Sequence, residues 1–241
     1  MTGIEFEHIV IVVDDLQEAI ADFQGMGFHV REGGPNGPTE NALIVFSDGN
    51  YIELIAMRSP VMRKMSVIAS RLGLMRLVLM LLPVGVRRYL HWFGQPSGIA
   101  DIALRTHDIK ALARETEEKS LIAPETVRQF QRPGVDGEQA RWLLASDAGY
   151  EPPFFIEDIT DRALRIPIVG QDEHPNRTIA IVKIELPEEL FGRLKGLFHK
   201  PELFVSDFSK VHIVLETIND ESIDLSESTR YGFRLSLIPY Q

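Results

Sequence analysis

Cysteine is absent from the 241-residue chain. Disulfide bonds and thiolate metal sites are therefore both excluded. The chain also lacks a cationic leader followed by an apolar segment, so nothing indicates export and we expect a cytoplasmic protein. The apolar run from Leu77 to Leu82 is far too short to span a bilayer. No P-loop, dinucleotide-binding fingerprint, nucleophile elbow or His-Glu-x-x-His motif is present, which removes the enzyme classes that depend on them.

Acidic residues are absent from one long segment of an otherwise acidic protein. The formal net charge is -10, which argues against nucleic-acid partners. Residues 54–100 hold seven of the 25 Lys and Arg residues and no Asp or Glu, so the rest of the chain holds 18 basic and 35 acidic side chains. This basic segment needs an explanation of its own.

The first 57 residues alternate between strand and helix patterns. Residues 4–13 are rich in β-branched side chains and predict a strand. A period of two places one set of its side chains on a single face: Ile4, Phe6, His8, Val10 and Val12. Asp15 is expected to cap a helix that ends at Gly25. Its inward stripe is Leu16, Ala19, Ile20 and Phe23. Further strands are expected at residues 28–31, 42–46 and 51–56, with a loop at 33–38.

The same order of strand, helix and three strands recurs along the chain. A shift of 93 residues aligns Asp15 with Asp108 and His8 with Asp101, and a third, weaker copy begins near Ile179. We therefore predict an α+β protein of repeated βαβββ units that form a curved mixed-sheet cup. The expected parts are a first unit (1–57), a helical insertion (58–97), a second unit (98–173) and a third, degenerate unit (174–241).

Two polar side chains stand out on the apolar strands because each is a potential metal ligand. His8 lies on the first strand, and Glu53 lies in Tyr51-Ile52-Glu53-Leu54-Ile55. A carboxylate is costly to bury unpaired, so Glu53 requires a metal ion, a basic partner or solvent. For His8, a buried imidazole that hydrogen-bonds a neighbour is the alternative to a metal ligand.

The basic segment 57–97 is predicted to form two helices broken near Pro83 and Gly85. It holds five of the seven methionines, a residue type common on adaptable surfaces. Three roles fit this composition. The segment packs on the domain or on a second subunit of a homodimer, covers the cup as a lid, or contacts a membrane surface as a basic amphipathic helix.

The order and spacing of these elements resemble the vicinal-oxygen-chelate superfamily, and within it the glyoxalase-like domain proteins. The matching features are His8-Ile9-Val10, the Gly33-Gly34 pair, Asn41, the Tyr-Ile-Glu-Leu strand at 51–54, and the later Arg141 to Leu144 and Pro152 to Ile156 segments. The superfamily includes glyoxalase I and extradiol dioxygenases, in which paired units curl into a cup.

The resemblance implies a divalent metal ion on the cup floor that chelates two neighbouring oxygens of the substrate and stabilises an anionic intermediate. The implied ligands are His8, Glu53 and Asp101, with the metal (zinc, manganese, iron or nickel) left open. The fourth ligand position falls near Phe155, which cannot ligate. The candidate catalytic bases are Glu53 and Glu157. The expected substrate contacts are Asn41, Tyr51, Arg141 and Phe155.

Three functions therefore stay open at the level of the sequence. The first is a metal-dependent lyase, isomerase or dioxygenase that acts on a small, partly hydrophobic molecule. The second is a non-catalytic protein that binds or sequesters a small molecule after losing part of the metal site. The third is a protein that docks on a membrane or a partner through residues 57–97.

Overall fold

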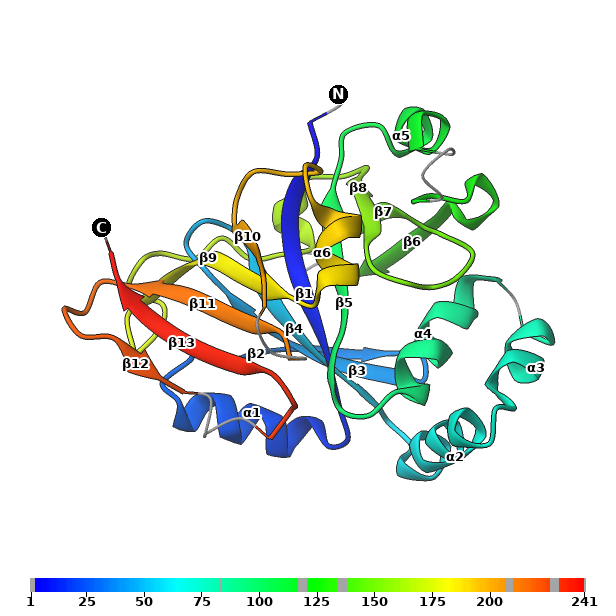
Figure 1. The fold of residues 1–241 in the computed structure, drawn as a ribbon, viewed down its shortest axis with the longest axis horizontal. Helices are drawn as coiled ribbons and strands as arrows, with labels where there is room; N and C mark the ends of the chain where they lie inside the picture. Colours follow the sequence, from blue (N-terminus) through cyan, green and yellow to red (C-terminus); the bar gives the residue numbers. More distant parts are fainter. Residues whose placement is uncertain are drawn as a thin grey trace.

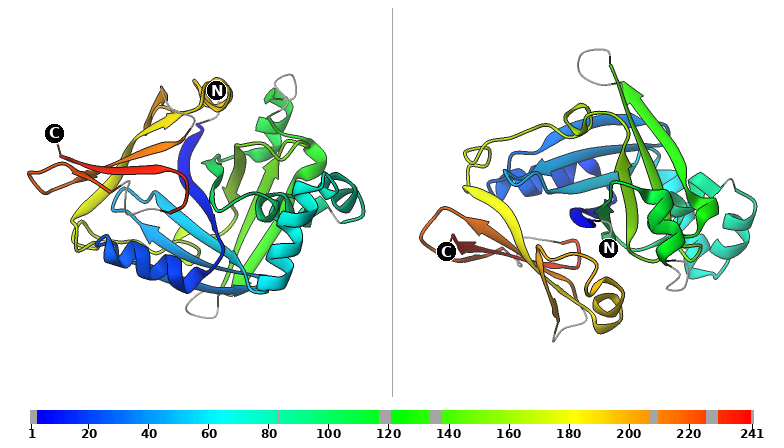
Figure 2. Two further views of the ribbon diagram at one scale, coloured as in Figure 1. Left: turned by 60° about the horizontal axis from the view of Figure 1, so that its bottom comes forward. Right: turned by 90° about the horizontal axis from the view of Figure 1, so that it is seen from above.

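Two β-sheets organise the residues that the computed structural model describes, which are 3–82, 84–116, 121–133, 138–206, 210–225 and 230–240. The larger sheet is curled, and the smaller sheet lies at one end of the molecule, opposite the helices that follow β4 (Figures 1 and 2). The α+β class with repeated βαβββ units is confirmed.

Eight strands form the larger sheet in the order β2-β3-β4-β1-β5-β8-β7-β6. Their bounds are β1 Glu5–Val13, β2 Arg31–Asn36, β3 Thr39–Val45, β4 Tyr51–Met57, β5 Gly98–Arg105, β6 Arg128–Pro133, β7 Gln139–Ser146 and β8 Phe154–Asp158. β1 runs parallel to β4 and β5 runs parallel to β8, while β1 and β5 pair antiparallel at the centre. The first and second units thus meet along their first strands, and their concave faces join into one cup.

The convex face of this sheet carries the main hydrophobic core. The helices α1 (Leu16–Gly25) and α5 (Ile109–Thr116) cover it, with the short 3-10 helix Pro124–Thr126 beside α5. Asp15 caps α1 as predicted, since its carboxylate accepts from the backbone N of Glu18 at 3.0 Å. The predicted stripe of α1 is buried.

The smaller sheet packs against the same convex core. Its strands are β9 Thr178–Leu186, β10 Glu202–Val205, β11 His212–Thr217, β12 Ile223–Asp224 and β13 Arg234–Pro239, in the order β10-β9-β11-β13-β12, with helix α6 at Glu188–Leu194. Apolar side chains such as Ile184, Leu215 and Leu235 join the core that contains Ile9 and Ile11 of β1. The third unit therefore supports the cup from behind and leaves its concave face open.

The insertion between the first two units forms three helices instead of the two that the sequence predicts: α2 (Pro60–Arg71), α3 (Met75–Met80) and α4 (Val84–Gly94). The extra break falls at Gly73, whose φ of +70° is a left-handed conformation that ends a helix. Gly85 lies within α4, and Pro83 is outside the described residues. Trp92 and Phe93 of α4 pack on the concave face, against Val10 and Phe154. Among the described residues, no helix is long and apolar enough to cross a membrane.

A β-bulge in β1 changes the predicted alternation of side chains. Phe6 pairs with Leu104 and His8 pairs with Ala103, which leaves Glu7 as an extra residue. Phe6 consequently lies in the convex core, whereas His8 faces the cup, so the predicted shared face for these two residues is wrong. Bulges are frequent beside functional sites because they redirect side chains. Here the bulge buries Glu7, with 1% of its surface exposed, next to His8.

Candidate metal and substrate site

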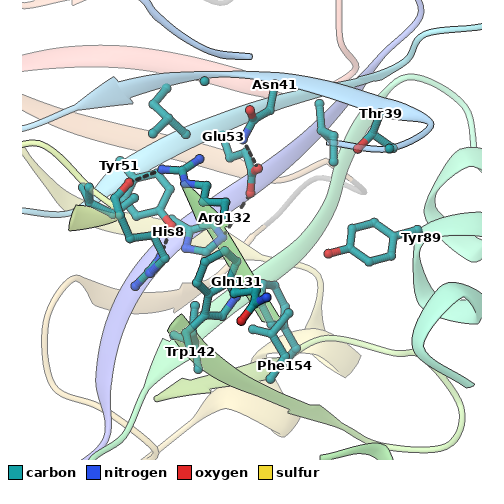
Figure 3. A pocket seen from close by; sticks show the side chains of 18 of the residues that line it. His8, Thr39, Asn41, Tyr51, Glu53, Tyr89, Gln131, Arg132, Trp142 and Phe154 are labelled. Carbon is teal, nitrogen blue, oxygen red and sulfur yellow. Dashed lines mark hydrogen bonds and ion pairs between the residues drawn. The ribbon is translucent and has the colours of Figure 1, made fainter. Parts of the chain in front are cut away.

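A cavity of about 230 Å³ lies on the concave face of the larger sheet (Figure 3). Its polar lining includes His8, Thr39, Asn41, Glu53, Gln131 and Arg132. Its aromatic lining consists of Tyr51, Tyr89, Trp92, Trp142 and Phe154. A small concave site with few polar groups among aromatic walls is typical of a site for a small organic ligand.

His8 and Glu53 point toward each other on the floor of this cavity (Figure 3). Nε2 of His8 lies 3.4 Å from Oε2 of Glu53, without the geometry of a hydrogen bond. Neither ring nitrogen of the buried His8 has a hydrogen-bond partner among the described residues. The imidazole stacks on Tyr51 with ring centroids 4.2 Å apart, which fixes its orientation. Buried polar atoms without partners are uncommon, so the ring nitrogens of His8 are candidate donors to a ligand in the cavity.

Asn41 holds the carboxylate of Glu53 from the neighbouring strand. Its Nδ2 donates to Oε1 of Glu53 at 2.7 Å, which leaves Oε2 directed at His8. A methyl group at Gly33 on β2 would overlap Oδ1 of Asn41, so this position requires glycine for Asn41 to sit there. Burial opposes the charge of Glu53, but His8, Asn41 and Arg132 outweigh it and hold the pKa of the carboxyl below its ordinary value. Glu53 is therefore an anion at neutral pH.

A buried ion-pair network borders the floor, and its Arg165 is itself part of the cavity lining. Arg165, which follows the 3-10 helix Arg162–Leu164, pairs with Glu7 and with Asp158, whose Oδ1 accepts from Nε at 2.8 Å. Its Nη1 donates to the hydroxyl of Tyr51 at 3.0 Å, so the network also holds the ring on which His8 stacks. Burial opposes the charge of Glu7, but Arg165, His8 and Arg162 hold the pKa of its carboxyl below the ordinary value. The alternation of β1 gave no signal for Glu7, because only the bulge turns it inward.

The structure does not bring Asp101 to His8 and Glu53. Asp101 is fully buried, and its Oδ2 accepts from Nε of Arg88 and from Nε1 of Trp92, each at 2.7 Å. Its Oδ1 accepts from the backbone N of Ile102 at 2.9 Å. Both oxygens of the predicted third ligand are thus engaged by α4 and the backbone. The sequence could not show this, because the engaging side chains belong to the insertion.

The register of the central strands explains which ligand positions survive. In the pairing of β1 with β5, Glu7 and Ala100 have no partner on the opposite strand. These two residues are 93 positions apart, which is also the offset between His8 and Asp101. Glu53 pairs with Val10, and Phe154 pairs with Ala103, so Phe154 takes on β8 the place that Glu53 takes on β4. The first unit keeps donor side chains at both of its predicted ligand positions, and the second unit keeps neither as a free donor.

His8 and Glu53 fit half of the coordination shell of a divalent cation. Two ligands that each lie about 2.1 Å from a tetrahedral ion are roughly 3.4 Å apart, which matches the distance between Nε2 and Oε2. In the described part of the chain, no group of three or more His, Asp or Glu side chains is arranged to hold a metal ion. An ion here would take its remaining ligands from substrate oxygens or water.

Three other predicted residues lie away from the cavity. Arg141 is exposed on the outer side of β7. Phe155 is fully buried in the convex core, because Phe154 is the residue of β8 that faces the cup. Glu157 accepts from the backbone N of Ile109 at 2.8 Å, at the start of α5. A strand period of two makes these errors systematic, since an error of one position moves a side chain to the opposite face.

Several residues of the cavity were not identified from the sequence, among them Tyr89, Arg132, Trp142 and Phe154. Arg132 and Trp142 come from β6 and β7. Assigning the large apolar side chain of Trp142 to the buried face would have predicted which side chains of these strands face the cup. Tyr89 comes from α4, and no local pattern shows that this helix reaches the cup. Asn41 and Tyr51, in contrast, line the cavity where the resemblance placed them.

Comparison with known proteins agrees with this fold. A family model described as a glyoxalase-like domain matches residues 6–198. A hypothetical protein from Staphylococcus aureus superposes with a TM-score of 0.68 at 16% identity, and the alignment covers 98% of this chain and 100% of that one. Homoprotocatechuate 2,3-dioxygenase from Brevibacterium fuscum gives a TM-score of 0.47 at 10% identity over 98% of this chain and 80% of that one. The enzyme from Arthrobacter globiformis gives 0.46 at 11% identity over 99% and 80%.

No curated protein matches the sequence. The likeness to the staphylococcal structure shows the fold alone, since the identity is low. The family model, however, spans most of the chain, including both halves of the cup. The chain therefore belongs to the glyoxalase-like domain family, as its resemblance to the vicinal-oxygen-chelate superfamily predicted.

Proposed function

We propose that this protein is a glyoxalase-like enzyme that binds a small oxygenated substrate in the cup, with a divalent metal ion held by His8 and Glu53. The observation that carries the proposal is the geometry of this pair. The buried imidazole of His8 has no hydrogen-bond partner among the described residues, and its Nε2 lies 3.4 Å from Oε2 of Glu53. Two donors in this arrangement fit one ion, and the rest of its shell is left for the substrate.

When bound, such an ion would act as a Lewis acid that polarises substrate oxygens and stabilises negative charge on them. The protein supplies the placement of the donors. Asn41 keeps Oε2 of Glu53 turned toward His8, and Tyr51 fixes the plane of the imidazole. Arg132 adds a positive charge beside Glu53 that favours an anionic substrate. Trp142 and Phe154 line the cavity with apolar surface, which limits water and strengthens these electrostatic interactions.

The test is metal binding by the purified full chain. Isothermal titration calorimetry with manganese, iron(II), nickel or zinc should show one bound ion per chain of the wild type. Elemental analysis of the desalted protein should give the same stoichiometry. His8→Ala and Glu53→Ala should each weaken binding by about tenfold or more. His212→Ala is the matched control, because His212 lies on β11 of the smaller sheet and should leave the affinity unchanged. Absence of stoichiometric binding, or an equal loss with His212→Ala, would rule the metal site out.

A non-catalytic binding protein is the second candidate, and the state of the second unit favours it. Arg88 neutralises Asp101 and lies over the ring of Phe154, with 5.3 Å between Cζ and the ring centroid. The guanidinium of Arg88 thus lies beside Asp101 and Phe154, which occupy two of the four expected ligand positions. If this candidate is correct, small carboxylates and diols will bind in the cup with the same affinity before and after treatment with a chelator.

A further inference from the structure

Helix α2 is inverted relative to an ordinary surface helix. Its buried residues are polar: Arg63 is 3% exposed and Ser66 is 7% exposed. Nε of Arg63 donates to Oδ1 of Asp14 at 2.9 Å, and its Nη1 donates to the backbone oxygens of Phe93 and Gln95. These bonds fix the rotation of α2 and turn its apolar stripe toward solvent. A helix of a soluble domain normally buries that stripe.

The exposed apolar surface continues from α2 through α3 to the start of α4. Of the 17 large apolar side chains that are exposed among the described residues, 11 lie in this part of the chain: Val61, Met62, Met65, Ile68, Leu72, Leu74, Leu77, Val78, Met80, Leu81 and Val86. We call this set the apolar face. Met65 is 64% exposed, Leu77 is 61% exposed and Leu81 is 87% exposed. So large a concentration of exposed apolar side chains marks a contact surface.

The segment that carries the apolar face has charged side chains of one sign only. Residues 54–100 contain seven basic residues and no acidic residue, in a protein whose net charge is -10. Arg63 and Arg88 are neutralised by Asp14 and Asp101, but Arg58, Lys64 and Arg71 are exposed. None of these three exposed side chains pairs with a carboxylate in the described part of the chain. Their charge is therefore available to an outside partner.

We propose that the apolar face of α2 and α3 docks the protein on an anionic lipid surface. Exposed leucine, isoleucine and methionine side chains would enter the boundary between headgroups and acyl chains, while Arg58, Lys64 and Arg71 would contact anionic headgroups. A second copy of the chain fits less well, because two such faces would bring their basic side chains together. Helix α4, which packs against α2 and α3, carries Tyr89 and Trp92 of the cavity lining.

Vesicle co-sedimentation of the full chain tests this proposal. The vesicles contain phosphatidylcholine alone, or phosphatidylcholine and phosphatidylglycerol in equal parts. The wild type should pellet with the anionic vesicles, and the bound fraction should fall as salt is added. Met65→Glu/Leu77→Glu should lower the partition coefficient by about tenfold or more. Ile168→Glu/Tyr240→Glu is the matched control, because it adds the same charge at positions that are also exposed (88% and 66%) and should bind as the wild type does.

Light scattering after size-exclusion chromatography gives the oligomeric state of the wild type and of each variant. All of the replaced side chains are exposed, so circular dichroism should show wild-type folding for each variant. The proposal is overturned if the wild type stays in the supernatant, if it binds neutral vesicles equally well, or if both double variants bind alike. It is also overturned if the wild type is a dimer that Met65→Glu/Leu77→Glu converts to monomers without vesicle binding, since the apolar face then belongs to a second copy.

Discussion

Replacing Arg165 with methionine should be among the most damaging single changes in this protein. Glu7 is 1% exposed, and among its charged neighbours Arg165 contributes most to keeping the carboxylate ionised. Removing one partner of a buried ion pair costs about 3–5 kcal/mol. Arg162 stays 3.4 Å from Oε1 of Glu7 and offsets part of this loss, so we expect a cost near 3 kcal/mol, the lower end of that range.

The assay is urea unfolding followed by tryptophan fluorescence and circular dichroism, for the wild type, Arg165→Met, Glu7→Gln and the double variant. The double variant removes both charges together, so it should be more stable than the sum of the two single losses predicts, by about 1–3 kcal/mol. Arg230→Met, which breaks an exposed pair with Asp22, should shift the midpoint only slightly. The reasoning is refuted if Arg165→Met unfolds at the wild-type midpoint or if the losses add.

The ion pair between Glu7 and Arg165 also makes the free energy of unfolding depend on pH. Because the pKa of Glu7 is lower in the folded state than its ordinary value, the pair contributes fully above the ordinary carboxyl range. This contribution is lost as the pH falls through the folded pKa, when Glu7 takes up a proton. Arg165→Met should therefore show less loss of stability on acidification than the wild type shows.

Two further predictions concern the support of the site and its pH range. Gly33→Ala should displace Asn41 and weaken metal binding by about tenfold in isothermal titration, whereas Gly25→Ala, with open space around an added methyl, should not. His174 lies between Val45 and His29, and burial lowers the pKa of its imidazole from 6.5 to about 4. The unfolded chain is protonated first, so stability should fall between pH 6.5 and 4, and His174→Asn should flatten this slope in thermal melts; an unchanged slope would contradict the assignment.

The sequence predicted those features of the fold that depend on local patterns. The stripe and cap of α1 follow from helical spacing, and the alignment of His8 with Asp101 follows from the repeat. It also placed Asn41, Tyr51 and Glu53 correctly in the cup, because the first unit keeps the pattern of its family.

The remaining features depend on tertiary contacts that leave no local trace. The bulge at Glu7 is set by the pairing of β1 with β5, and no property of Glu7 itself announces it. Asp101 matches a ligand position in the repeat, but Arg88 and Trp92 of α4 donate to its carboxylate. The resemblance placed Phe155 in the cup, but Phe154 faces inward, and only the pairing of β8 determines which of these two neighbouring residues does so.

The contact between Arg88 and Asp101 also determines whether the insertion can be deleted from this protein. Burial raises the pKa of Asp101, and Arg88 is the strongest influence that opposes this rise. A chain from which residues 58–97 were excised would keep a carboxyl at the centre of the sheet without its cation or its tryptophan donor. Such a truncated protein would favour a protonated aspartate or a disrupted β5. The insertion is thus part of the folding unit, and its role has to be studied by replacing single exposed side chains in the intact chain.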